Sequence, residues 1–138
     1  MSTFREIISR VNDCRPNAFS DKSKFLWLTR LEGKIAADVF LMDIQRIRAL
    51  PHSYPADLDA ETLVRYPHDD IYDAWLEAVI DEKNGDYGKY QNSMDFYNEL
   101  YGNFKLWFIS TYEPAQEGSD ISGYFEETQQ TGTGGDGA

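Results

Sequence analysis

Apolar residues recur at three- and four-residue steps near the start of the chain and predict a first helix. This apolar stripe consists of Phe4, Ile7, Ile8 and Val11. Thr3 and Glu6 have the spacing of a capping box, in which each residue satisfies a backbone donor of the other at the helix start. Pro16 restricts the residue before it to extended backbone, so we expect this helix to end at Arg15.

A second stripe predicts a helix of about 20 residues that begins after Ser20 or Asp21, either of which can act as its N-cap. Its apolar positions are Phe25, Leu28, Leu31, Ile35, Val39 and Met42. Trp27 lies off this stripe, which leaves two alternatives: it packs on the first helix, or it faces a partner.

A third helix is predicted between Asp69, a suitable N-cap, and Asn84-Gly85, which tolerate the left-handed backbone that ends helices. Its expected inward face consists of Ile71, Trp75, Val79 and Glu82. The short turn after it makes the next helix an antiparallel neighbour.

The fourth helix has the clearest pattern, with Asp86 as its N-cap and a span of residues 86–112. Its aromatic-rich seam alternates steps of three and four and is typical of a core-facing stripe. The seam consists of Tyr87, Tyr90, Met94, Tyr97, Tyr101, Phe104 and Phe108. Leu100 and Trp107 form a second apolar row, which predicts that this helix is central.

Two segments lack helical periodicity. Residues 43–67 contain Pro51, Pro55 and Pro67 and are interpreted as a long loop or arm, although Ile44, Ile47 and Leu50 fit either a continued helix or a strand. Residues 113–138 are acidic and end in a Gly-rich stretch, so we expect an extended or disordered tail. The predicted fold is all-α: a four-helix-bundle-like domain over residues 1–112, with the 43–67 loop or arm, and an interface tail over 113–138.

Charge is distributed unevenly along these segments. The net charge of −11 comprises +3 in residues 1–48, −8 in 49–112 and −6 in 113–138. Because DNA binding draws much of its affinity from neutralised phosphates, a chain this acidic is a poor candidate to grip DNA. The single cysteine excludes an internal disulfide, and no apolar run predicts a membrane span, which fits a protein made in the cytoplasm.

No residue pattern predicts catalysis, a cofactor or a metal. His52 and His68 lack metal-ligand spacing, and His68 is interpreted as part of the entry into the third helix. Asp73, Glu77 and Asp81 share one helix face. That face is either a solvated surface or, less often, a contact for a basic partner.

Several stretches resemble head–tail connector (adaptor) proteins of tailed bacteriophages and prophages, and the likeness covers about residues 20–110. The stretches are Phe25–Leu28, Gly33–Ile35, Tyr66–Tyr72, Trp75–Asp81 and Asn84–Met94. Gln91 stands where a second asparagine is expected, and the chain beyond Pro114 lies outside the resemblance.

The resemblance implies a helical virion protein of the neck, made in the bacterial host, that forms a homo-oligomeric ring, a dodecamer, on the portal protein. Such a ring holds the next head-closure or tail component, and genomic double-stranded DNA passes through its lumen without specific binding. Within the tail, we expect partner-binding anchors amid polar residues. These anchors are Ile121, Tyr124, Phe125, Glu126 and Glu127.

Two other classes of function remain open. A small acidic protein can mimic DNA and inhibit a host nuclease or restriction factor, in which case it acts as a monomer or dimer. An enzyme with a dispersed carboxylate site around Asp69, Asp70 and Asp73 would require a cleft in which the carboxylate pKa values are strongly raised.

Overall fold

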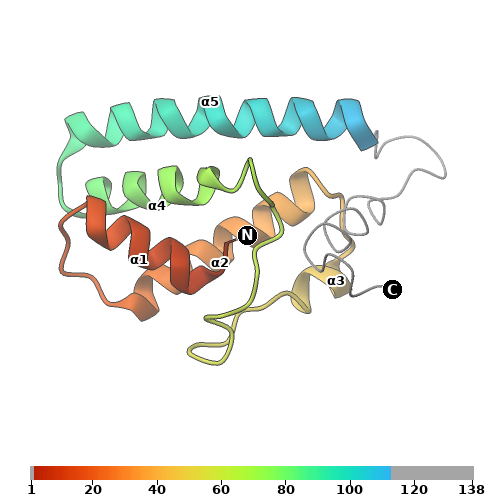
Figure 1. The fold of residues 1–138 in the computed structure, drawn as a ribbon, viewed down its shortest axis with the longest axis horizontal. Coiled ribbons are helices and arrows are strands. Elements are labelled where there is room, and N and C mark those ends of the chain that lie inside the picture. Colours follow the sequence, from red (N-terminus) through yellow and green to blue (C-terminus); the bar gives the residue numbers. More distant parts are fainter. Residues whose placement is uncertain (1, 113–138) are drawn as a thin grey trace.

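The computed structural model describes residues 2–112, and this part of the chain is helical without a strand that belongs to a sheet. Its helices are α1 (Phe4–Cys14), α2 (Asp21–Asp38), α3 (Ile44–Arg48), α4 (Asp70–Lys83) and α5 (Tyr87–Tyr112). The four longer helices alternate in direction, so that α2 and α5 run the same way (Figure 1). The all-α prediction is confirmed for these residues.

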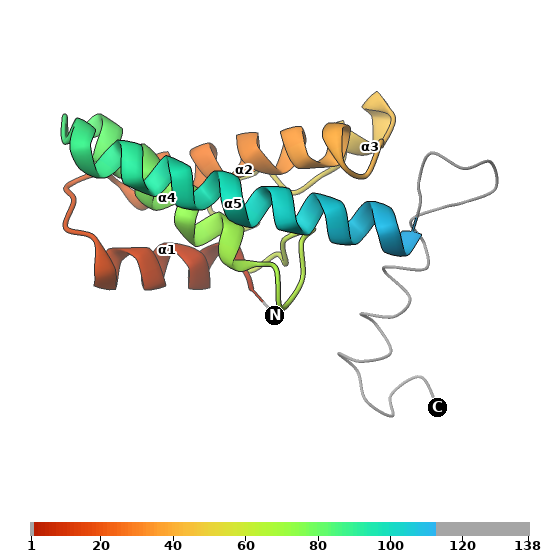
Figure 2. The same ribbon diagram turned by 90° about the horizontal axis from the view of Figure 1, so that it is seen from above.

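α4 is the central helix, because it packs against α1, α2 and α5. Seen from above, α1 and α2 lie to either side of α4, while α5 lies over it (Figure 2). The prediction that residues 86–112 form the central helix was therefore wrong. The predicted inward face of α4 holds for Ile71, which is buried, and for Trp75, which is half-buried and packs against the core. It was wrong for Glu82, which is exposed, and Val79 is half-buried. A helix packed on three sides buries more than one stripe. Its buried residues are Ile71, Tyr72, Ala74, Leu76, Ala78, Ile80 and Asp81.

Most helix ends follow the expected capping chemistry, but Asp69 at the start of α4 makes no side-chain capping hydrogen bond. Thr3 and Glu6 form the capping box, and Ser20 caps α2 by accepting a hydrogen bond from the Ser23 amide. Gly85 has φ +79° at the end of α4, a conformation that costs glycine little, and Asp86 accepts from the Lys89 amide at the start of α5. These local signals are the parts of the fold that the sequence specifies most directly.

α2 ends at Asp38, four residues before the end of its predicted stripe. The chain then turns at Leu41, whose φ of 53° is unusual for a residue other than glycine. Phe40 is buried and Met42 half-buried, so the stripe continues to pack after the helix has ended. Trp27 is half-buried and packs edge-on against Phe19, at 5.5 Å between ring centroids, in the link between α1 and α2. The alternative that it faces a partner stays a prediction.

Residues 43–67 are a long irregular connection, but they are not an arm that projects from the helices. Leu58, Leu63 and Val64 are part of the core cluster. The Arg5 amide donates to the Leu58 carbonyl at 2.9 Å, and an isolated β-bridge joins Thr3 to Glu61. The connection lies along the body because its apolar side chains enter the core and its backbone bonds to the start of α1.

The C-terminal half of the predicted seam on α5 is the buried half. Tyr97, Phe104 and Phe108 are buried, whereas Tyr90, Met94 and Tyr101 are half-buried. Tyr87 is 69% exposed, which departs from the expected seam. Among the helices, α5 packs mainly on α4, and the rings of Phe40 and His68 add contacts to its C-terminal half.

Candidate protein-interaction surfaces

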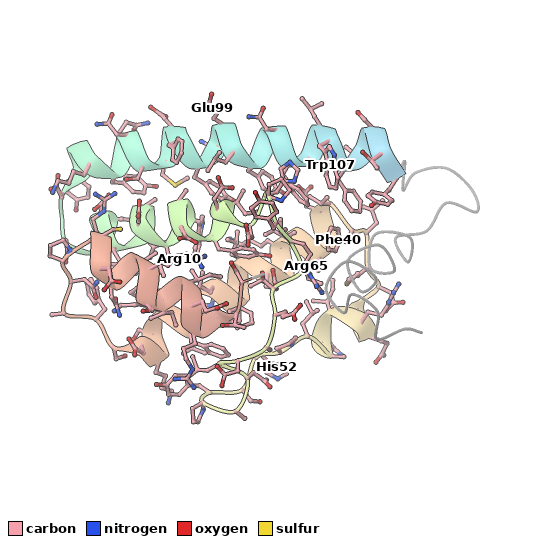
Figure 3. All side chains as sticks on the ribbon, viewed as in Figure 1. Arg10, Phe40, His52, Arg65, Glu99 and Trp107 are labelled. Carbon is pink, nitrogen blue, oxygen red and sulfur yellow. The ribbon has the colours of Figure 1, made fainter. Side chains whose placement is uncertain are left out.

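The outward face of α5 carries exposed apolar and acidic side chains. Leu106 is 68% exposed, and Phe96 and Ile109 are also exposed. One helical stripe on this face repeats at steps of four and three: Asp95, Glu99, Gly102, Leu106 and Ile109. Figure 3 shows Glu99 pointing away from the rest of the molecule. Apolar side chains gathered on an exposed face are typical of a protein-binding surface.

An aromatic cluster fixes the C-terminal end of α5 against the rest of the fold. The rings of Phe40 and Phe108 stack at 4.8 Å between centroids, and the His68 ring lies 4.7 Å from that of Trp107. Partial burial lowers the pKa of His68, which favours its neutral form. Beside this cluster in the sequence, Leu41 and Ile44 are exposed. The C-terminal end of α5 is thus held in place by these ring contacts, while Leu41 and Ile44 remain exposed to solvent.

α2 presents a basic outer face. Lys22, Arg30 and Lys34 are exposed, and none forms an ion pair with another residue of the described range 2–112. Leu26 lies at the same helical spacing between Lys22 and Arg30 and is also exposed. An open hollow of about 370 Å³ adjoins this face where Gly33 of α2 approaches Ile47 of α3. This face therefore combines positive charge with apolar side chains that contact solvent.

The acidic side chains on one face of α4 are paired within the subunit, unlike the cations on the basic face of α2 and unlike Glu99 on α5. Arg10 forms a bidentate pair with Asp73, with both nitrogen–oxygen distances at 2.8 Å. Arg15 lies 3.3 Å from both Glu77 and Asp81, and Asp81 also accepts from Ser93 at 2.7 Å. The interpretation of this face as a solvated surface was therefore wrong for Asp81, which is buried, whereas Asp73 and Glu77 are half-buried. A contact for a basic partner stays a prediction. The carboxylates of this face hold α1 and α5 against α4.

A buried carboxyl group ties the 43–67 connection to the core. Glu32 is 1% exposed and accepts hydrogen bonds from the Tyr72 hydroxyl at 2.5 Å and from the Leu63 amide at 2.7 Å. The Tyr72 hydroxyl itself accepts from the Val64 amide at 2.9 Å. Burial raises the pKa of Glu32 to about 7, against the opposing effect of these hydrogen bonds and of the Arg65 charge.

Sequence reasoning missed the Glu32 and Tyr72 pair, although a signal was present. Glu32 lies four residues after Leu28 and three before Ile35, inside the apolar stripe of α2. A carboxylate at such a position needs buried donors. Which donors it finds depends on α4 and the 63–64 backbone, and no local pattern reveals those.

Of the carboxylates considered for catalysis, Asp69 and Asp73 lie in one hydrogen-bonded network, because Arg10 donates both to Asp73 and to the Ser2 hydroxyl. Asp69 accepts from the Ser2 hydroxyl at 2.7 Å, and Asp73 is held by Arg10. Partial burial, followed by the charge of Asp69, raises the pKa of Asp70. Within residues 2–112 no group of three or more His, Cys, Asp and Glu side chains is arranged to hold a metal ion.

His52, His68 and Cys14 lie in different parts of the structure. His68 lies at the entry to α4, as predicted: its carbonyl accepts from the Ile71 amide at 3.3 Å. His52 is exposed in the 43–67 connection, and Cys14 is exposed at the end of α1. The expected tail anchors from Ile121 to Glu127 lie outside the described residues.

Comparisons with known proteins identify no relative: no family model, no curated protein and no solved structure matches this chain. Among the residues that the structure describes, the helices are too short or too polar to cross a membrane.

Proposed function

We propose that this protein is a structural subunit of a tailed-phage virion, a head–tail connector that forms a ring on the portal and links the DNA-filled head to the neck. The observation that carries the proposal is the outward face of α5. There, Phe96, Leu106 and Ile109 are exposed on a helix of 26 residues. A subunit that functions within a ring must contact neighbouring subunits, and exposed apolar side chains on a helix face are suited to such contacts.

Three further features support the proposal. The chain resembles connector proteins over about residues 20–110, and its four longer helices form a bundle-like body. The net charge of −11 repels phosphates, so a ring of these subunits lets DNA pass without holding it. The carboxylates of α4 bind arginines of the same subunit, which favours a structural role for them over a catalytic one.

Attachment of the full chain to the portal protein of the same phage tests the proposal. The two proteins are produced together, the portal is purified, and the complexes are weighed by native mass spectrometry and viewed by electron microscopy. A ring of this chain stacked on the portal is the expected result. A portal that emerges without this chain refutes the proposal, and a one-to-one complex with a host nuclease instead supports the DNA-mimic alternative.

A chain shortened after Glu113 tests the predicted tail in the same assay. We expect the shortened chain to keep its helical circular-dichroism spectrum and to lose attachment to the portal, because the anchors Tyr124 and Phe125 are gone. Full occupancy by the shortened chain would show that residues 114–138 are dispensable for attachment.

A further inference from the structure

We infer that the basic outer face of α2 docks on the outward face of α5 in a second copy of this chain, head to tail. This inference rests on the proposed function, because it assigns the two faces through which neighbouring subunits of the ring meet. The α2 face is defined by Lys22, Leu26, Arg30 and Lys34, and the α5 face by Asp95, Glu99, Leu106 and Ile109.

The first argument is charge left over after pairing within the subunit. The arginines at positions 5, 10 and 15 all bind carboxylates of the same subunit. Lys22, Arg30 and Lys34 bind none among residues 2–112, and Glu99 likewise has no cation partner in that range. Two faces of opposite sign therefore remain on one subunit, and copies of it can satisfy each other.

The second argument is the order of charged and apolar groups along each helix. On α5, Asp95 and Glu99 come first, and Leu106 and Ile109 follow. On α2, the cations Lys22, Arg30 and Lys34 come first, with the exposed Leu26 among them. The exposed Leu41 and Ile44 follow beyond the end of the helix at Asp38. On α5, Asp95 and Leu106 are eleven residues apart, which is about 16 Å at 1.5 Å per residue.

The third argument is direction. The order of groups matches only if α2 of one copy and α5 of the next run parallel. Within one subunit, these two helices run the same way (Figures 1 and 2). Rotation about an axis close to that shared direction preserves it, so a cyclic ring brings parallel faces together. A two-fold dimer about an axis across the helices would oppose them.

Charge reversal tests this interface on the purified full chain, without portal. One double variant carries Arg30→Glu and Lys34→Glu, and the other carries Asp95→Lys and Glu99→Lys. All four side chains are outside the core, so folding is expected to be unchanged. Sedimentation velocity and native mass spectrometry measure the assembly state. We expect wild-type oligomers that weaken with added salt, and self-association weakened at least about tenfold in each double variant.

Mixing the two double variants gives the decisive result, because the α2 face of each is then complementary to the α5 face of the other. We expect assemblies larger than a dimer that contain equal numbers of the two variants, with each variant next to the other. The matched control, Asp13→Lys with Glu82→Lys, changes two exposed acids outside both faces and should assemble like the wild type.

Three outcomes overturn the inference: a wild-type chain that stays monomeric, double variants that assemble like the wild type, or a mixture of the two variants that does not regain assembly.

Portal attachment is measured separately. A wild-type chain that joins the portal but fails the exchange test refutes the α2–α5 interface and leaves the proposed function standing. A chain that passes the exchange test but never joins a portal refutes the proposed function alone.

Discussion

Replacement of Glu32 by glutamine should stabilise the protein above neutral pH and leave it nearly unchanged in mild acid. Glutamine has the shape of the protonated carboxyl group. Its carbonyl can accept from the Leu63 amide as Glu32 does, and its amide can donate to the Tyr72 hydroxyl oxygen, which reverses the direction of the Tyr72 contact but keeps a hydrogen bond there. What the substitution removes is the negative charge buried among α2, α4 and residues 63–64.

The magnitude follows from the pKa of Glu32. Burial raises it from 4.5 to about 7, so the folded protein binds this proton more tightly than the unfolded chain does. The contribution of Glu32 to stability is therefore complete below pH 4.5 and falls as the pH rises. Above pH 7 the loss reaches about 3 kcal/mol, from about 1.4 kcal/mol per pKa unit.

The measurement is urea unfolding of the wild type and the Glu32→Gln variant between pH 5 and pH 8.5. The difference between the two free energies of unfolding isolates Glu32, because the other titrating groups are common to both proteins. We expect this difference to be small at pH 5 and to favour the variant by about 3 kcal/mol at pH 8.5. A difference that does not change with pH would refute the reasoning, since it would mean that Glu32 titrates alike in both states.

Three further predictions concern the core, the ion pairs and DNA. Phe104→Ala should destabilise the fold by about 3–5 kcal/mol, because Phe104 is fully buried, whereas Tyr87→Ala at an exposed site should cost about 0.5 kcal/mol or less in the same unfolding assay. Equal losses of stability in the two variants would contradict the burial of Phe104. Arg15→Met should cost about 2 kcal/mol, because it leaves the buried Asp81 carboxylate without its cation, and the simultaneous Asp81→Asn change should recover part of this loss. The assembled protein should show no measurable binding to duplex DNA in a fluorescence-anisotropy titration at physiological salt, and tight, salt-sensitive binding would contradict the charge argument.

The sequence by itself determined where α1 and α2 begin and where the turn between α4 and α5 falls. Thr3, Ser20, Gly85 and Asp86 act through backbone groups within a few residues, so their effect can be predicted without a tertiary contact. The stripes of α1 and α2 were also readable, because each of these helices buries one main face.

Only the tertiary structure decided which helix is central and which charges remain available. The seam of α5 repeats more regularly than any stripe of α4, yet α4 is the helix that is packed on three sides. Periodicity reports the width of an apolar stripe and not the number of neighbours that cover it. The pairing of Arg10 with Asp73 and of Glu32 with Tyr72 joins residues 63 and 40 positions apart. Such contacts depend on how α1, α2 and α4 pack, and this packing leaves the charges of α2 and α5 facing outward.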